Sequence, residues 1–250
     1  MGPGQIPIIE PKDFFVRRVG IVTAMRMEAR CITRGRLPFN QRISLGQSGS
    51  IWLCGMGEEA ARQAAKGLKK GGATALMSFG FAGALDSSLR PGDLVLPETV
   101  HAGYSMPVDL GWRSRLRQML PASLSVSGGT LVASKQVLSS ASAKLQLARV
   151  TGARAVDMES GAVAEAAVDA GLPFLAVRVI SDAVEFSPPV ALLAAIRPDG
   201  SADLVRLLPL LLRGSVTLPT LLRLAVESRA ACSTLSAVAR YANAELGIAQ

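Results

Sequence analysis

The chain has 250 residues, of which 49% are hydrophobic, 18% charged and 4% aromatic. It can bury one well-filled aliphatic core, which excludes a disordered protein and does not require a second domain. The formal net charge is +8. The Lys and Arg residues are nevertheless spread along the chain without a nucleic-acid-binding motif, so we expect no nucleic-acid partner. A basic protein is equally suited to an anionic membrane surface or a phosphate-bearing ligand.

Residues with metal or redox chemistry are few. The cysteines Cys31, Cys54 and Cys232 stand at unrelated spacings, and His101 is the only histidine. They form no CxxC or Cys/His cluster, so we predict no metal site and no cofactor. We interpret the cysteines as buried, reduced thiols of a cytosolic protein, and we expect a cytoplasmic location that includes the inner face of the membrane.

Short β-branched runs alternate with helical stretches along most of the chain. Strands are predicted at residues 19–24, 75–79, 93–100, 124–133, 153–157 and 175–180, with a polar hairpin over 42–54. Helices are predicted at residues 58–70, 141–150 and 162–170. This alternation is typical of an α/β fold, which we predict as a single-domain mixed β-sheet surrounded by helices.

The composition divides the chain into three parts. Residues 1–16 are rich in proline and are predicted to be a disordered leader without a signal peptide. Residues 17–200 are predicted to form the α/β domain, and residues 201–250 a Leu/Arg-rich helical extension of the same domain.

In α/β sheets ligands bind beyond the carboxyl ends of the strands, so polar residues at strand ends are the candidate site residues.

The first strand leads into Ala24-Met25-Arg26-Met27-Glu28. A carboxylate four residues beyond a buried strand can point back over the sheet edge toward a ligand. The spacing alone favours another interpretation, an ordinary surface acid at the start of a helix, where a negative charge suits the helix dipole.

Gly80-Phe81-Ala82-Gly83 follows the second long strand. Small residues in a turn after a strand let a ligand approach the backbone, whose N–H groups can bind an anion or a polarised oxygen. The run is not the dinucleotide-binding GxGxxG. A glycine-rich turn without a ligand is the alternative.

Asp157-Met158-Glu159 stands where a strand gives way to a helix. If Glu159 faces a pocket, it can accept hydrogen bonds from two neighbouring hydroxyls, as a ribose diol would offer. The alternative is capping of the helix N-terminus by Asp157 or Glu159.

The strand over 175–180 ends in Ser181-Asp182. Partial burial at the mouth of a strand favours the protonated form of a carboxyl group, which can then act as an acid. The alternative is an Asp that caps the next turn.

The order and spacing of these segments resemble the nucleoside phosphorylase/nucleosidase superfamily, and within it the methylthioadenosine/S-adenosylhomocysteine nucleosidases. That branch has Ala-Met-x-x-Glu after its first strand, a Gly-Ser-Ala-Gly turn, a Pro- or Val-Gly-Asp strand, a Met-Glu pair and a strand ending in Ser-Asp. Besides the four segments above, Pro91-Gly92-Asp93 matches this pattern. The resemblance runs from about residue 19 to residue 182.

The resemblance implies cleavage of a purine nucleoside, with Asp182 and Glu28 as the catalytic residues. Asp182 would protonate or hydrogen-bond purine N7, and Glu28 would orient and deprotonate the attacking water. Glu159 would hold the 2′- and 3′-hydroxyls, and Met158 would pack under the sugar. The other predicted substrate-binding residues are Asp157, Phe81, Ala82, Gly83, Val137, Met25 and Ser181.

Three departures from the family pattern bear on the nucleophile and the base. Phe81 stands where phosphate-using members commonly carry serine, and Ser78 where bacterial purine phosphorylases carry arginine. Because phosphate needs several such donors, hydrolysis is favoured over phosphorolysis, although Arg26 or Arg30 could substitute. Val137 replaces an aromatic residue that stacks on the base in the family.

The segment from Leu204 is apolar but is interrupted by charged, Pro and Gly residues, so it is not a spanning helix. It fits two core helices joined by a turn, a subunit interface, or an amphipathic hairpin at a membrane surface. With the helix expected over 221–245, it resembles the tail of the hopanoid-associated phosphorylases. This implies release of adenine from adenosylhopane, a lipid-linked nucleoside.

The leading hypothesis is therefore a nucleosidase acting on adenosylhopane or a related 5′-substituted adenosine. One alternative is a phosphorylase with phosphate as co-substrate and a ribose-1-phosphate product. Another is a non-catalytic family member that binds nucleosides or a membrane partner. The family resemblance also implies a homodimer or higher homo-oligomer.

Overall fold

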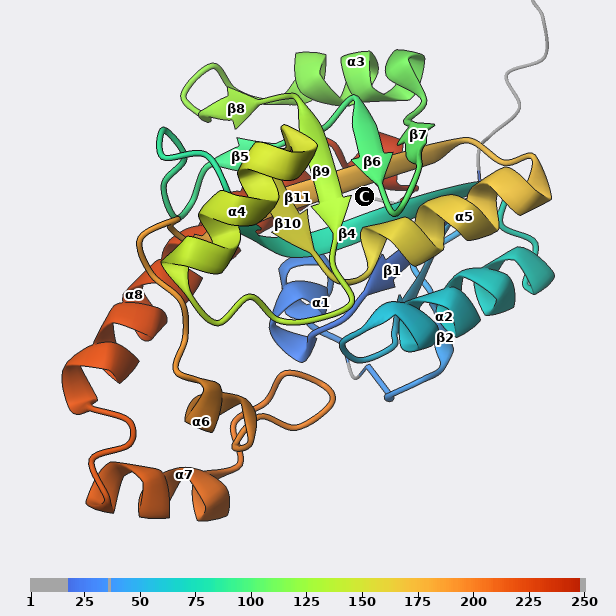
Figure 1. Ribbon diagram of the computed structural model, residues 1–250. Coiled ribbons are helices and arrows are strands. Elements are labelled where there is room, and N and C mark those ends of the chain that lie inside the picture. Colours follow the sequence, from blue (N-terminus) through green and yellow to red (C-terminus); the bar gives the residue numbers. More distant parts are fainter. Residues whose placement is uncertain (1–17, 36, 248–250) are drawn as a thin grey trace, which may run out of the picture.

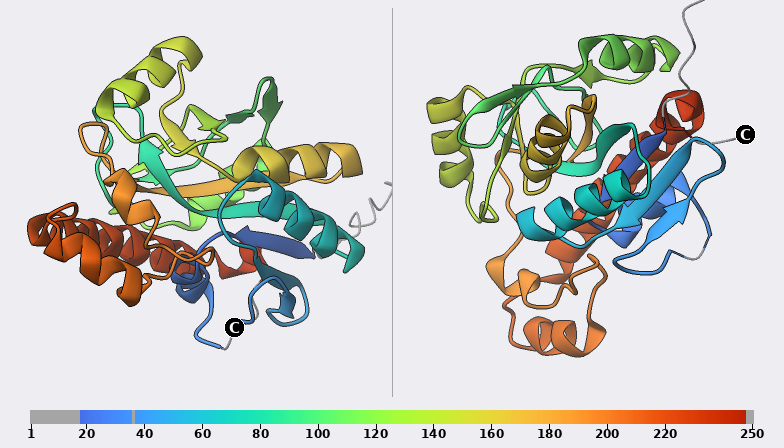
Figure 2. Two further views of the ribbon diagram at one scale, coloured as in Figure 1. Left: turned by 60° about the horizontal axis from the view of Figure 1, so that its bottom comes forward. Right: turned by 90° about the vertical axis from the view of Figure 1, so that its right-hand side faces the viewer.

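The structure is a computed structural model that describes residues 18–35 and 37–247 (Figure 1). It confirms the predicted α/β fold: the described residues form one mixed sheet of eleven strands with helices on both faces (Figures 1 and 2). The leader predicted over residues 1–16 lies outside the described residues.

The strands form a path in the order β2-β3-β1-β4-β10-β9-β6-β7, while β11 pairs with β4 and β5, and β8 pairs with β5. Their bounds are β1 Val19–Thr23, β2 Arg42–Ser44, β3 Gly49–Leu53, β4 Ala75–Ala84, β5 Leu94–Val95, β6 Thr99–His101, β7 Ser105–Pro107, β8 Val126–Ser127, β9 Thr130–Ala133, β10 Ala155–Asp157 and β11 Phe174–Asp182.

The helices are α1 Arg26–Ile32, α2 Glu58–Lys70, α3 Leu110–Met119, α4 Ala141–Thr151, α5 Ser160–Ala170, α6 Val190–Leu193, α7 Leu204–Leu212 and α8 Leu218–Tyr241, followed by the 3₁₀ turn η1 Asn243–Leu246. Helices α2 and α5 pack together on one face of the sheet, and α1 packs with α8 on the other (Figures 1 and 2).

Helix α2 has the predicted bounds because its end signals are local. Two acids occupy its first turn, two lysines its last, and Gly71 follows it. Its alanines and Leu68 form the buried face toward the sheet.

Strands β4 and β11 form the centre of the sheet and are parallel along most of their length. Nearly all of their residues are buried. Strand β10 runs antiparallel to β4, with Val156 opposite Gly83. The carboxyl ends of β10 and β11 therefore meet beside the last residues of β4, and this meeting point holds the polar residues discussed below.

The predicted glycine-rich turn at residues 80–83 is wrong, because β4 continues through these residues to Ala84. The glycine at position 80 is explained by a close tertiary contact. A Cβ at position 80 would overlap the Glu28 carboxylate and the Arg178 guanidinium. Gly80 is thus required by two charged side chains of the protein that press against the strand.

Two predicted strands are each divided in the structure. Residues 93–100 contain β5 and β6, and residues 124–133 contain β8 and β9. In the second case Gly128 and Gly129 make the break, and Gly129 has a φ of +99°. The break lets β8 pair with β5 while β9 pairs with β6 and β10.

The Leu-rich segment forms two helices, but the interpretation of both as core helices is wrong. Helix α7 has no buried residue among those described, and Figure 1 shows it apart from the sheet. Only the C-terminal half of α8 joins the core, through Ala231, Leu235 and Val238. No helix among residues 18–35 and 37–247 is long and apolar enough to cross a membrane.

The cysteines are free thiols, as predicted, but only Cys54 is buried. Cys31 on α1 and Cys232 on α8 are half-buried where these two helices pack together. The expectation of three buried thiols is therefore wrong for two of them.

Substitution of two helical glycines by alanine is expected to change the free energy of unfolding in opposite directions. A Cβ at Gly67 in α2 would overlap the Trp52 ring, whereas at the exposed Gly111 in α3 it would meet only ordinary van der Waals contacts. We expect Gly111→Ala to raise the free energy of unfolding by about 0.5–1 kcal/mol through helix propensity. Gly67→Ala gains the same propensity but overpacks Trp52 at a cost of about 1–3 kcal/mol, so we expect net destabilisation.

Urea denaturation of both variants, with Trp fluorescence recorded in the native state, measures this difference. Equal stabilisation by both substitutions would show that Trp52 does not confine position 67.

Candidate active site

A pocket lies where β10 and β11 end beside β4. Its lining includes every predicted site residue: Met25, Glu28, Phe81, Ala82, Gly83, Val137, Asp157, Met158, Glu159, Ser181 and Asp182. Segments far apart in the sequence thus converge on one place. Their contacts define what each side chain can do there.

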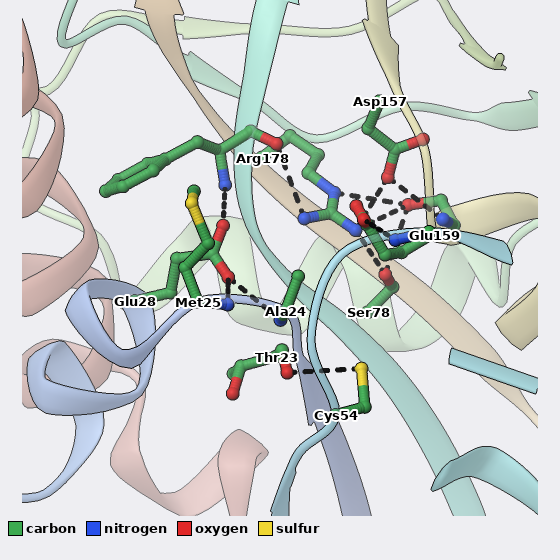
Figure 3. Close-up of polar contacts among 12 residues, drawn as sticks. Thr23, Ala24, Met25, Glu28, Cys54, Ser78, Asp157, Glu159 and Arg178 are labelled. Carbon is green, nitrogen blue, oxygen red and sulfur yellow. Dashed lines mark hydrogen bonds and ion pairs between the residues drawn. The ribbon is translucent and has the colours of Figure 1, made fainter. Parts of the chain in front are cut away.

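Glu28 lies in the first turn of α1, directly after β1, and is 1% exposed. One carboxylate oxygen accepts hydrogen bonds from the N–H groups of Ala24 and Met25 at 3.0 and 2.8 Å, and the other from Phe81 N at 2.8 Å (Figure 3). The interpretation of Glu28 as a surface acid is therefore wrong. A carboxylate has about four lone-pair sites, so these three donors leave one for a ligand or a water.

Arg178 is a buried cation that the sequence analysis passed over as part of an apolar strand. It is 1% exposed and pairs with Asp157 Oδ2 at 2.6 Å (Figure 3). It also donates to the hydroxyls of Ser78 and Ser160 and to the Phe81 carbonyl. An arginine in the middle of a strand buried on both faces must have partners, and that rule was the available signal.

The hydroxyl of Ser78 is therefore occupied by Arg178 beneath the pocket. By the family resemblance, Ser78 stands where bacterial purine phosphorylases carry an arginine. In this protein the position serves to hold a buried guanidinium, and Ser78 is fully buried and absent from the pocket lining.

Asp157 and Glu159 both lie at the start of α5 but have different contacts. Asp157 Oδ2 accepts from Ser160 N at 2.9 Å, so Asp157 does cap the helix. Glu159 makes no capping bond and instead accepts from Gly57 N at 2.8 Å through Oε1. Asp157 Oδ1 is buried without a hydrogen-bond partner among the described residues. Glu159 Oε2 is the carboxylate oxygen left for a ligand.

Burial governs the protonation of the two glutamates. It raises the pKa of Glu159 to about 7, with a further contribution from the neighbouring Asp157 carboxylate. Burial also raises the pKa of Glu28, against the opposing effects of Arg178 and of the three backbone N–H donors. Two carboxyl groups with raised pKa values in one pocket are a feature typical of catalytic sites.

Asp182 ends β11 and is held from two sides. Its Oδ1 accepts from the Ser181 hydroxyl at 2.8 Å, and its Oδ2 accepts from Lys144 Nζ. Lys144 lies on α4, is 2% exposed and also lines the pocket. The sequence analysis missed this lysine, because α4 offers no pattern that separates a buried lysine from a solvated one.

A local cluster fixes α4 over the pocket. The Ser140 hydroxyl accepts from Ala143 N at 3.1 Å and caps the helix. Leu147 and Ala148 then pack against Val132 and Val156 in a small hydrophobic cluster of their own. This packing places Lys144 beside the end of β11.

The pocket is rich in acidic side chains. It is lined by Glu28, Asp157, Glu159 and Asp182, with Lys144 as the one basic side chain among the described lining residues. Within the described ranges, no group of three or more His, Cys, Asp or Glu side chains could hold a metal ion.

The arginines that could have replaced the missing phosphate ligands lie elsewhere. Arg26 pairs with Asp199 at 2.9 Å and donates to the Leu37 carbonyl. Arg30 lines a separate hollow between α1 and α8. Neither side chain lines the pocket.

Comparison with known proteins identifies the family. A family model described as the phosphorylase superfamily matches residues 19–191. Since this is well over half of the chain, the protein belongs to that superfamily. It is accordingly an enzyme of the nucleosidase and phosphorylase class, whose reaction is cleavage of an N-glycosidic bond. No curated protein sequence gives a significant match to the chain.

Solved structures share this fold at low sequence identity. The 5′-methylthioadenosine/S-adenosylhomocysteine nucleosidase of Neisseria meningitidis, bound to methylthio-immucillin-A, superposes with a TM-score of 0.66 at 17% identity, over 91% of this chain and 97% of that one. Futalosine hydrolase of Helicobacter pylori gives 0.63 at 17% identity, over 90% and 98%. S-adenosylhomocysteine nucleosidase of Streptococcus pyogenes gives 0.62 at 19%, over 91% and 98%.

The raised pKa of Glu159 predicts a pH-dependent stability. The folded state favours the protonated carboxyl, so this stabilisation is complete below the ordinary glutamate pKa of about 4.5 and is lost as pH rises through the folded-state pKa of about 7. The glutamine of Glu159→Gln cannot ionise, so the variant does not lose this stability as pH rises. We expect the variant to match wild type near pH 4.5 and to exceed it at pH 8 by on the order of 2–3 kcal/mol.

Guanidinium denaturation between pH 4.5 and pH 8 measures the difference, with the exposed Glu185→Gln as a matched amide control. A difference between Glu159→Gln and wild type that stays constant over this range would contradict the assignment.

Proposed function

We propose that the protein hydrolyses the N-glycosidic bond of a purine nucleoside, with Glu28 as the general base and Asp182 as the general acid. The observation that carries the proposal is the buried Glu28 carboxylate. Three backbone N–H groups hold it in place while one lone-pair site is left at the pocket, as activation of a water requires.

The anionic lining suits the charge that develops during this reaction. As the bond between C1′ and N9 breaks, the ribosyl group becomes cationic, and fixed carboxylates around it stabilise that charge. Glu159, whose Oε1 accepts from Gly57 N, is proposed to hold the 2′- and 3′-hydroxyls through its remaining acceptor sites. Met158 lines the same wall and would pack under the sugar.

Asp182 lines the same pocket at the end of β11 and is proposed to protonate purine N7. Protonation makes the base a better leaving group, because the electron pair of the broken bond then enters a cationic ring and the base departs as a neutral molecule. Phe81, Ala82, Gly83 and Val137 line the pocket with Asp182 and would form the apolar surroundings of the base.

Water is favoured over phosphate as the nucleophile. A phosphate dianion needs several cationic donors, but Lys144 is engaged by Asp182 and neither Arg26 nor Arg30 lines the pocket. Phosphate is therefore not proposed as a co-substrate.

We further propose a 5′-substituted adenosine as substrate, and adenosylhopane in particular. Support for a lipid-linked substrate comes from α7 and the N-terminal half of α8. Seven apolar side chains there are 59% to 83% exposed: Leu204, Val205, Leu208, Leu212, Leu218, Leu222 and Val226. The exposed arginines Arg197, Arg206 and Arg213 accompany them. Leucines with adjacent arginines match the acyl boundary and the phosphates of a bilayer surface.

On this proposal the enzyme is cytoplasmic, contacts the inner face of the membrane peripherally and works as a homodimer or larger homo-oligomer. The named relatives have small nucleoside ligands: the Neisseria enzyme is bound to methylthio-immucillin-A and the Streptococcus enzyme to 5-methylthiotubericidin. The exposed apolar side chains of α7 and α8 would serve a substrate that stays in the membrane.

The hydrolytic mechanism is tested by adenine release from adenosylhopane and from methylthioadenosine, with and without phosphate. We expect release that does not depend on phosphate. Asp182→Asn and Glu28→Gln should each lower kcat by about 10²–10⁴-fold, because each removes one proton-transfer group. Asp169→Asn, an exposed change on α5, serves as the control.

A requirement for phosphate would replace hydrolysis with phosphorolysis. Wild-type turnover by Asp182→Asn would remove it as the acid. No release from either substrate would favour a protein that binds nucleosides without cleaving them.

Membrane contact is tested by sedimentation with anionic phosphatidylglycerol vesicles. Substitution is preferable to truncation, since α8 carries core residues such as Leu235. We expect Leu208→Asp/Leu212→Asp to lower the bound fraction at least about tenfold, because each change exposes a charge to the acyl region. The control, Val150→Asp/Val168→Asp, changes exposed valines on α4 and α5 and should bind like wild type. Equal binding by both double variants would contradict the proposed surface.

A further inference from the structure

The contact between Lys144 and Asp182 conflicts with a simple acid role for Asp182. A general acid must carry a proton, but an ammonium group in contact with a carboxylate favours its ionised form. The two side chains are in hydrogen-bond contact, and Lys144 is almost completely buried. The proton that would reach the base must therefore be stored somewhere else in the empty site.

Lys144 is saturated as an ammonium group. Its Nζ donates to Asp182 Oδ2, to the Ala183 carbonyl at 2.8 Å and to the Phe186 carbonyl at 2.6 Å. An ammonium has three N–H donors, and three acceptors are present. A neutral amine could satisfy only two of them. The geometry thus places a proton on Nζ, directly against the carboxylate.

We propose that Lys144 is a positioning residue that stores the proton which Asp182 delivers to the leaving base. This inference rests on the proposed function, since it takes Asp182 as the acid. The Lys144–Asp182 pair shares one proton, which lies on Nζ in the empty site and moves to the carboxylate when a base arrives. The pair, and not Asp182 alone, is the acid.

The step balances in atoms and charge. The C1′–N9 bond breaks, and its electron pair passes to the purine ring. One N–H bond of Lys144 breaks as Asp182 gains a proton, and Asp182 passes a proton to N7. Water oxygen bonds to C1′, and the proton it loses goes to Glu28. After release of products, Glu28 returns a proton to solvent and the neutral Lys144 amine takes one up.

Other charged groups near Asp182 do not provide this proton. Glu28 on α1, Asp157 at the end of β10 and Glu159 at the start of α5 line the same pocket, but the side-chain partners of Asp182 among the described residues are Lys144 and Ser181. Arg178, four residues earlier on β11, is engaged by Asp157. On β4 the neighbour of Asp182 is Gly83, which carries no charge. Glu185 in the following segment is exposed.

The proposal is tested by the pH dependence of kcat for adenine release. An isolated aspartic acid loses its proton near about pH 4 and a lysine ammonium near about pH 10. If the pair holds the proton, wild type keeps its kcat up to about pH 9. Lys144→Met should lose kcat as pH rises above about 6, falling about 10²–10⁴-fold below wild type at pH 8.

Lys144→Arg separates proton storage from charge. Arginine keeps the positive charge and the donors but does not lose a proton in proteins. We therefore expect Lys144→Arg to fail at pH 8 as Lys144→Met does. Arg149→Met removes a positive charge from an exposed position of α4 and should keep the wild-type profile. Thermal melting of each variant accompanies the kinetics.

Several outcomes would overturn the proposal. One is a wild-type kcat that already falls near pH 5–6 as pH rises, a test that needs no variant. A second is a pH profile of kcat for Lys144→Met that is unchanged or shifted to higher pH, which would make Lys144 a simple counter-charge. A third is full activity of Lys144→Arg. Full activity of Asp182→Asn would overturn the proposed function itself. This measurement leaves Lys144 unchanged, so the two failures can be distinguished.

Discussion

The buried pair between Arg178 and Asp157 is the interaction on which the rest of the site depends. Three carboxylates, Glu28, Asp157 and Glu159, are brought out of water within one region, and Arg178 is the cation beneath them. Removing one partner of a buried pair typically costs about 3–5 kcal/mol, since the other charge remains unpaired. The small residues Ser78 and Gly80 on β4 make room for this guanidinium, so the strand's sequence follows from the ion pair.

The two buried cations suit different tasks. Arg178 does not lose its proton, and a fixed positive charge suits the carboxylates that are proposed to hold a sugar and a water. Lys144 lies beside Asp182, the carboxylate proposed to serve the base, and lysine can exchange its proton. Arginine therefore suits the position beside Asp157 and lysine the position beside Asp182, although both side chains are buried.

Sequence analysis was reliable where local chemistry decides the structure. The bounds of α2 follow from its end charges and Gly71, and the α/β alternation predicts the sheet. It failed where distant contacts decide. The sequence predicts Gly80 to be a turn residue. The actual requirement for glycine, the close approach of the Glu28 and Arg178 side chains, is a tertiary contact that the local sequence does not reveal. The burial of Lys144 is likewise set by the packing of α4 on a separate cluster, which no helical periodicity reveals.

The segment after β11 joins the two parts of the proposed function. Lys144 binds the carbonyls of Ala183 and Phe186, and the chain then continues through α6 into the exposed α7. The same ammonium group therefore anchors both the acid and the start of the segment that carries the exposed leucines. The Phe186 ring, in turn, lies 4.1 Å under the guanidinium of Arg223 on α8. A lipid-linked nucleoside drawn from a bilayer by this surface would thus meet a pocket whose acid is fixed by the same short stretch of chain.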